Sequence, residues 1–243
     1  VVSLLVMQWG FFLLPVVLAA VLLRMDLRQT FALRLPRLLP LLAAAVLGLT
    51  AWTFASGILL RIAPPPETLV RGLERLLRLT DEGAPLWVIW LVVAVTPAIC
   101  EEALFRGFVL NGLRPLGAVP AIGISALLFG VAHASIYRLL PTVFLGIVLG
   151  IVVWRTGSLL SGVVMHALNN GLLASLTSSP ELTRLVGVQP GADALPWTPT
   201  LVGTGIAALA LGGLLLLSDG GMVLVRKRTG AAAAGPAPDP VSY

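Results

Sequence analysis

The sequence predicts an all-α protein: a polytopic transmembrane helix bundle of about seven spans with a short amphipathic surface helix. Apolar residues make up 58% of the 243 residues and charged residues only 11%, whereas a soluble domain has roughly 25% charged residues. Apolar runs close to the ~20 residues that cross a bilayer recur along the chain. The net charge of +5 comes from basic residues lying between these runs. That placement fits control of membrane topology and disfavours nucleic-acid binding.

The first part of the chain contains two of these runs and a segment of different character. Residues 3–23 form the first span, which contains Pro15, a residue that transmembrane helices tolerate. An arginine-rich loop over residues 24–37 leads to the second span at residues 38–60. Residues 67–78 then place leucines on one face and charges on the other, which predicts an amphipathic helix on the membrane surface. A helix packed on loops of the same protein fits this pattern equally well.

The remaining spans are predicted at residues 86–113, 119–134, 139–154, 157–176 and 200–217. In the third of these five, Gly146 and Gly150 have the Gly-x-x-x-Gly spacing that permits close helix packing. We assign residues 1–228 to a single transmembrane domain with a catalytic core at about residues 86–177. Residues 229–243 are rich in Ala, Gly and Pro, and we expect a disordered tail.

The distribution of basic residues predicts the orientation. With the N-terminus outside and the C-terminus inside, more basic residues fall in the inner loops than in the outer ones, as the positive-inside rule requires. The arginine-rich, lysine-poor composition suggests a bacterial source, and we therefore expect an integral protein of the bacterial inner membrane.

Two adjacent carboxylates stand out in the span at residues 86–113. Glu101, Glu102 and Arg106 interrupt a run that is otherwise without charge. An ionised side chain at membrane depth costs at least ~2.5–3.5 kcal/mol, which makes these residues functional candidates. Glu102 and Arg106 have the i, i+4 spacing of a helical ion pair. Adjacent helical residues point about 100° apart, so Glu101 faces elsewhere and is the candidate general base. Pro97, one turn earlier, is expected to kink the helix and set the angle of Glu101.

Both histidines of the chain also lie in apolar runs. His133 shares a helix face with Phe129, and His166 shares one with Asn170. A rise of ~1.5 Å per residue places Glu101, His133 and His166 at comparable depths. Glu101 with His133 could activate a water molecule while His166 and Asn170 stabilise an oxyanion. Zinc bound by Glu101, His133 and His166 is the alternative, and a polar network that only supports packing is a second one.

Other hydrolase signatures are missing or weak. No H-E-x-x-H motif occurs, and no Asp falls within a span, which disfavours a zincin-like site and an aspartyl dyad. A Ser125–His166 dyad would leave the two glutamates unexplained. The single Cys100 excludes an intrachain disulfide and is interpreted as a buried small residue.

Three motifs in chain order resemble those of the CPBP family, which contains CAAX prenyl proteases and bacteriocin-processing proteins and is also called Abi or Rce1-like. They are Glu-Glu-x-x-x-Arg at 101–106, Phe-x-x-x-His at 129–133 and His-x-x-x-Asn at 166–170. The resemblance implies an intramembrane glutamate-type endopeptidase. It assigns Glu101 as the catalytic carboxylate, His133 as its partner in activating water, and His166 with Asn170 as the oxyanion side.

In that mechanism the supporting residues are Glu102, Arg106 and Phe129, and no cofactor is required. A zinc mechanism that uses Glu101, His133 and His166 as ligands stays possible. The expected partners are a membrane-bound peptide or protein substrate and the lipid bilayer. An ABC-type permease in the same chain or complex is a further expectation, because some bacterial members of the family appear to follow such a permease segment. The rival hypothesis is a non-enzymatic membrane module, such as a bacteriocin-immunity factor or a permease accessory, with a structural polar cluster.

Overall fold

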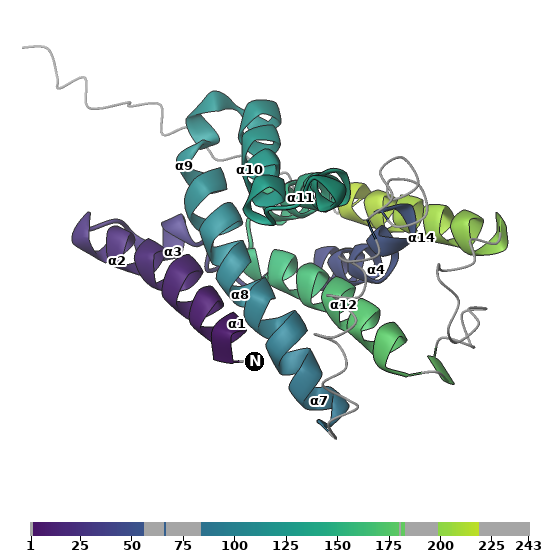
Figure 1. The fold of residues 1–243 in the computed structure, drawn as a ribbon. Coiled ribbons are helices and arrows are strands. Elements are labelled where there is room, and N and C mark those ends of the chain that lie inside the picture. Colours follow the sequence, from purple (N-terminus) through teal and green to yellow (C-terminus); the bar gives the residue numbers. More distant parts are fainter. Residues whose placement is uncertain (1, 56–65, 67–83, 180, 183–198, 219–243) are drawn as a thin grey trace, which may run out of the picture.

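The computed structural model describes residues 2–55, 66, 84–179, 181–182 and 199–218 (Figure 1). Helices and short connections account for this part of the chain, and no strand occurs in it. Four helices are long and apolar enough to cross a membrane: Val2–Leu22, Leu86–Gly112, Ile136–Thr156 and Leu159–Leu176. Three shorter apolar helices accompany them: Leu38–Phe54, Ala118–Ala132 and Gly205–Leu217. The predicted polytopic helix bundle is therefore confirmed.

Two of the long helices are built from several segments. The N-terminal one consists of α1 (Val2–Val6), the π-helical η1 (Met7–Leu13) and α2 (Leu14–Leu22). The second consists, in order, of α7 (Leu86–Ile89), η4 (Trp90–Val95), α8 (Thr96–Glu102), η5 (Ala103–Val109) and α9 (Leu110–Gly112). The other elements are α3 (Leu27–Thr30), α4 (Leu38–Phe54), η6 (Arg114–Leu116), α10 (Ala118–Ala132), α11 (Ile136–Thr156), α12 (Leu159–Ser178) and α14 (Pro199–Ser218).

Proline explains where two of the π-helical segments lie. Pro15 follows η1 and Pro97 follows η4, each at the start of the next α-helical segment. Proline lacks the backbone N–H, and its ring clashes with the carbonyl oxygen four residues earlier. A wider π-helical turn before the proline lets the helix continue through it. Both candidate glutamates consequently lie on α8, between η4 and η5.

Small residues allow the helices to approach each other closely. A Cβ on Gly146 would lie 2.9 Å from the Cα of Ala126, and one on Gly150 would lie 2.9 Å from the side chain of Ile122. The predicted Gly-x-x-x-Gly contact is thus present, between α11 and α10. A Cβ on Gly48 of α4 would clash with the carbonyl oxygen of Met165 on α12. These contacts hold α10, α11, α4 and α12 close together.

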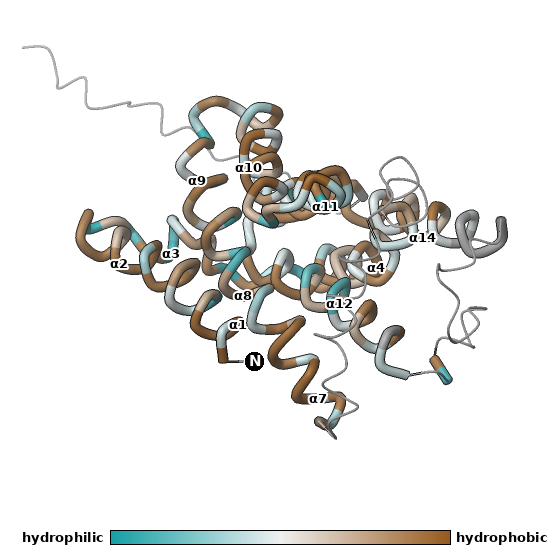
Figure 2. Tube along the Cα trace, in the orientation of Figure 1, coloured by the Kyte–Doolittle hydropathy of each residue, from teal (hydrophilic) through white to brown (hydrophobic). Residues whose placement is uncertain are grey.

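The two long segmented helices differ in how much of their surface is covered. The apolar window of Val2–Leu22 is only 17% buried inside the protein, whereas that of Leu86–Gly112 is 61% buried. Figure 1 shows α1 and α2 running along one side of α8, while α10, α11 and α12 lie on the other side. The second helix is therefore central, and the N-terminal helix has most of its surface free to face lipid. Figure 2 shows hydrophilic segments on α8 and α12, among helices that are mostly hydrophobic, and further ones in the connections around α3.

Several boundaries differ from the prediction. Helix α11 begins at Ile136 instead of residue 139, because Ser135 has an extended backbone that starts the helix earlier. The loop over residues 24–37 contains the short helix α3, whose first amides are capped by the Asp26 carboxylate. The predicted amphipathic helix at residues 67–78 and the tail at residues 229–243 lie outside the described residues.

Candidate active site

Glu102 is the centre of a fully buried charge cluster. The Arg106 Nη1 atom donates a hydrogen bond of 2.8 Å to Glu102 Oε1, and neither side chain is exposed. The predicted i, i+4 ion pair is therefore present. The same carboxylate oxygen also lies 2.9 Å from the Nδ1 atom of His166, a contact that the spacing could not predict. Arg106 Nη2 donates to the Gly146 carbonyl oxygen at 3.1 Å, which ties the pair to α11.

Glu101 faces different partners. Its Oε1 atom accepts a hydrogen bond of 2.8 Å from the side-chain amide of Gln8, on the N-terminal helix. Its Oε2 atom lies 3.9 Å from His166 Nε2, which is too long for a direct hydrogen bond. The side chain keeps 10% of its surface exposed. One oxygen of Glu101 thus accepts a hydrogen bond from an uncharged amide, and the other faces a histidine without bonding to it directly.

The hydrogen bonds of both histidines restrict their tautomers. His133 Nδ1 lies 2.8 Å from the Phe129 carbonyl oxygen, and His166 Nδ1 faces the Glu102 carboxylate. A carbonyl or carboxylate oxygen only accepts, so Nδ1 carries the hydrogen in each ring. In a neutral ring the Nε2 atom is then free to accept a hydrogen bond or a proton. His166 directs this atom towards Glu101.

The Phe129 ring joins the two sides of the site. Its centroid lies 4.8 Å from that of His133 and 5.8 Å from that of His166, with both pairs edge-to-face. The Arg106 guanidinium carbon lies 4.4 Å from the same centroid. Arg106, His133 and His166 therefore lie around one aromatic ring, and Glu101 faces His166 from α8. His133 makes no hydrogen bond or ion pair with Glu101.

Asn170 is placed differently from the other motif residues. Its amide nitrogen lies 3.5 Å from the Val93 carbonyl oxygen, and its amide oxygen accepts from Asn169 at 3.3 Å. It therefore contacts η4, and no hydrogen bond connects it to His166. Its expected role beside an oxyanion stays a prediction.

A zinc ion in a protein is held by at least three His, Cys, Asp or Glu side chains grouped around one point. Among the residues that the structure describes, no three His, Cys, Asp or Glu side chains are grouped to hold a metal ion. Glu101, His133 and His166 do not form such a group in this arrangement, because Glu101 turns to Gln8 and His166 turns to Glu102. We therefore derive no catalytic step through a metal.

Residues 83–172 match the family model described as Type II CAAX prenyl endopeptidase Rce1-like. This segment of the chain is similar to the CPBP family of CAAX proteases, the family that the three motifs resemble. Comparison with curated proteins and with solved structures gives no match. The Rce1-like segment contains all of the candidate residues identified from the sequence: Glu101, Glu102, Arg106, Phe129, His133, His166 and Asn170. The family match and the apolar helices together support an integral membrane protein with a protease role. Nothing in the comparisons supports the expected ABC-type permease.

Gln8 is the site residue that the sequence interpretation missed. It lies far outside the Rce1-like segment, yet its side chain contacts the candidate base. A signal was present, because Gln8 is a polar residue within an apolar run, as the two histidines are. It passed unnoticed because an uncharged amide costs less to bury than a carboxylate.

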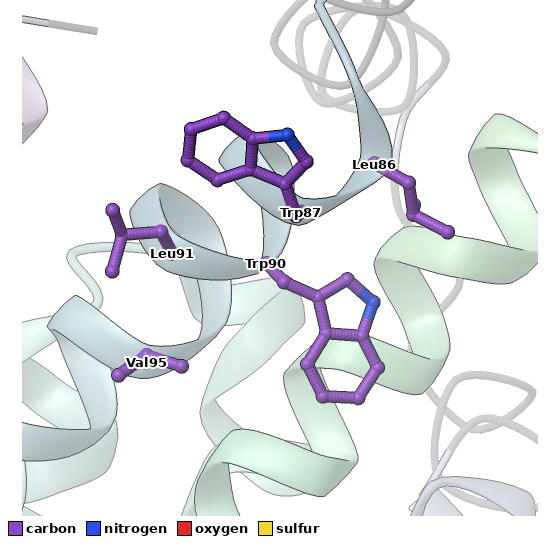
Figure 3. A pocket seen from close by; sticks show the side chains of 5 residues that line it. All are labelled: Leu86, Trp87, Trp90, Leu91 and Val95. Carbon is purple, nitrogen blue, oxygen red and sulfur yellow. The ribbon is translucent and has the colours of Figure 1, made fainter.

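A surface pocket lies beside the site but does not include it. This apolar pocket has a volume of about 500 Å³. It is lined by Leu86, Trp87, Trp90, Leu91 and Val95 of α7 and η4, whose side chains Figure 3 shows. The Trp90 ring reaches towards α12, where its indole nitrogen donates to the Ser175 hydroxyl at 2.9 Å. None of the glutamates or histidines of the site lines this pocket.

Proposed function

We propose that the protein is an intramembrane endopeptidase that hydrolyses peptide bonds of membrane-associated substrates, with Glu101 as the general base. The observation that carries this proposal is the unequal pairing of the two glutamates. Glu102 is already engaged by Arg106 and His166, whereas Glu101 has only a neutral donor. Glu102 Oε2 also has no hydrogen-bond partner among the described residues, but its side chain is fully buried. Glu101 keeps 10% of its side chain exposed, so its Oε2 atom is the one that can take a proton from water.

We place the reacting water between Glu101 Oε2 and His166 Nε2. Two polar atoms 3.9 Å apart are too distant for direct bonding and suited to a bridging water. In the proposed reaction, the water oxygen adds to the substrate carbonyl carbon while Glu101 takes one water proton. Collapse of the tetrahedral intermediate breaks the C–N bond, and Glu101 returns the proton to the leaving nitrogen. His133 and His166, whose Nε2 atoms carry no hydrogen in the neutral ring, accept hydrogen bonds from the attacking water, and either ring donates from Nε2 to the developing oxyanion once it is protonated.

The decisive test compares Glu101→Gln with wild type in cells. Membrane peptides are quantified by mass spectrometry, together with a prenylated CAAX peptide added to isolated membranes, a probe suggested by the family description. Loss of a general base lowers turnover by about 10²–10⁴-fold. We expect cleavage products to disappear in Glu101→Gln although the isosteric protein folds and inserts normally.

Wild-type turnover in Glu101→Gln would overturn the assignment. If the cleavage products of wild type and of a strain lacking the protein are the same, the protein is a non-enzymatic membrane module instead.

Metal dependence provides a second test. Because the proposed mechanism uses no metal, we expect dialysis against a strong zinc chelator to leave the turnover number unchanged. Restoration of lost activity by added zinc would show that Glu101, His133 and His166 rearrange into a metal site.

A further inference from the structure

Gln8 is an unusual residue for its position in the fold. The N-terminal helix is only 17% buried, and α1 contains no buried residue. Within η1, Gln8 alone is buried, with 3% of its surface exposed. A helix that is free to face lipid over most of its surface thus turns one polar side chain inwards, and that side chain meets Glu101.

The hydrogen bond has a defined direction. The Gln8 amide nitrogen donates to Glu101 Oε1 at 2.8 Å, and a bond between an amide N–H and a carboxylate is stronger than one between neutral groups. With Oε1 held in this way, the carboxylate rotates little, and Oε2 stays directed to His166 Nε2. The bond therefore fixes which oxygen of Glu101 faces the reacting water.

The half of the helix that follows Gln8 is firmly anchored. Val16 and Ala20 of α2 pack in one apolar cluster with Ala103 of η5 and Leu159 at the start of α12. The Phe12 ring also lies 6.2 Å from that of Phe105. The same two helices that carry the glutamates and His166 therefore hold the N-terminal helix, so the donor and its acceptor keep their relative positions.

We propose that Gln8 is a positioning residue for the reaction and acts by orienting the Glu101 carboxylate. This inference rests on the proposed role of Glu101 as the base, and it extends the site to a helix outside the Rce1-like segment. A purely structural reading fits poorly, because the Gln8 Oε1 atom is buried without a hydrogen-bond partner among the described residues. An unpaired buried acceptor costs free energy that an apolar side chain of equal size would avoid.

Gln8→Met tests the proposal, because methionine keeps the length of the side chain and removes both the donor and the acceptor. The substrate is the membrane peptide whose cleavage depends on Glu101, synthesised and assayed with purified protein in proteoliposomes. Loss of a hydrogen bond to a charged group predicts a decrease in kcat of about 10- to 100-fold. KM should stay within about threefold, because the bond orients the base and does not bind substrate.

Two matched controls separate positioning from packing. Gly10→Ala lies in the same π-helical segment, where an added Cβ meets nothing within 4 Å, and should keep wild-type kcat. Val16→Ala creates a cavity in the anchoring cluster and should lower the Tm while kcat is retained well below that temperature. Gln8→Asn keeps the amide but shortens the side chain, so it should also lower kcat, and it decides the question if Gln8→Met does not fold.

The outcomes distinguish this inference from the proposal on which it rests. If Glu101→Gln is inactive and both Gln8 variants have wild-type kcat, the role of Gln8 is wrong while the role of Glu101 stands. The role of Gln8 would also be wrong if Val16→Ala lowered kcat as much as Gln8→Met does, or if Gln8→Met raised KM and left kcat unchanged. An active Glu101→Gln would overturn the proposed function itself.

Discussion

Glu101 and Glu102 are adjacent on one helix, and their surroundings differ in nearly every respect. Glu102 is completely buried and shares one oxygen between an arginine and a histidine. Glu101 keeps some exposure and receives one hydrogen bond from an uncharged amide. The difference arises from helix geometry, because neighbouring side chains point about 100° apart. Both glutamates face His166, but Glu101 also meets Gln8 of the N-terminal helix, whereas Glu102 meets Arg106. The type of residue does not decide which carboxylate is structural and which is free to react; the neighbours do.

The largest loss of stability is expected from breaking the ion pair between Glu102 and Arg106. Arg106→Met leaves a buried carboxylate without its cation, and losing one partner of a buried pair costs about 3–5 kcal/mol. We expect a large decrease in the free energy of unfolding, measured in bicelles, and loss of activity only as a consequence of unfolding.

The matched control removes both charges together. Glu102→Gln with Arg106→Met leaves no unpaired ion, so most of the stability should return. If the double variant is as unstable as Arg106→Met alone, the unpaired carboxylate is not the cause of the loss.

The same comparison shows what the sequence could and could not reveal. The bundle and the Glu102–Arg106 pair were predictable, because apolar runs and i, i+4 spacing are local patterns. The Gln8–Glu101 bond joins residues 93 positions apart, and the His166–Glu102 contact joins residues 64 positions apart. Such contacts depend on how helices pack, and no periodicity within one helix encodes that. The pairing of His166 with Glu102 could therefore not be foreseen from the motifs.

A smaller effect is expected from crowding Glu102 without removing a charge. A Cβ on Gly162 of α12 would lie 2.7 Å from Val153 Cγ2 and 2.9 Å from Glu102 Oε2. Gly162→Ala should therefore push α12 away from α8 and lower the free energy of unfolding by about 1–3 kcal/mol. Gly123→Ala is the control, because an added Cβ there meets nothing within 4 Å. Equal thermal stability of the two variants would contradict the close approach of α12 to Glu102.

The smallest loss of stability is expected from changing Phe129, whose ring contacts Arg106 and both histidines. Phe129→Leu keeps an apolar side chain but removes the edge contacts to His133 and His166 and the contact with Arg106. Aromatic and cation–π contacts contribute about 0.5–2 kcal/mol each, and leucine recovers part of the packing, so we expect a net loss of about 1 kcal/mol.

The informative measurement for Phe129→Leu is the ratio of its effects on stability and on turnover. The Glu102 side is held by hydrogen bonds and should stay in place. Among the described residues, the hydrogen bond and the ring contact of His133 are both made with Phe129. Turnover should therefore decrease more than stability, through increased freedom of His133. If kcat stays at the wild-type value while stability decreases, His133 does not need this orientation for the reaction, and the reactive side of the site reduces to Glu101 and His166.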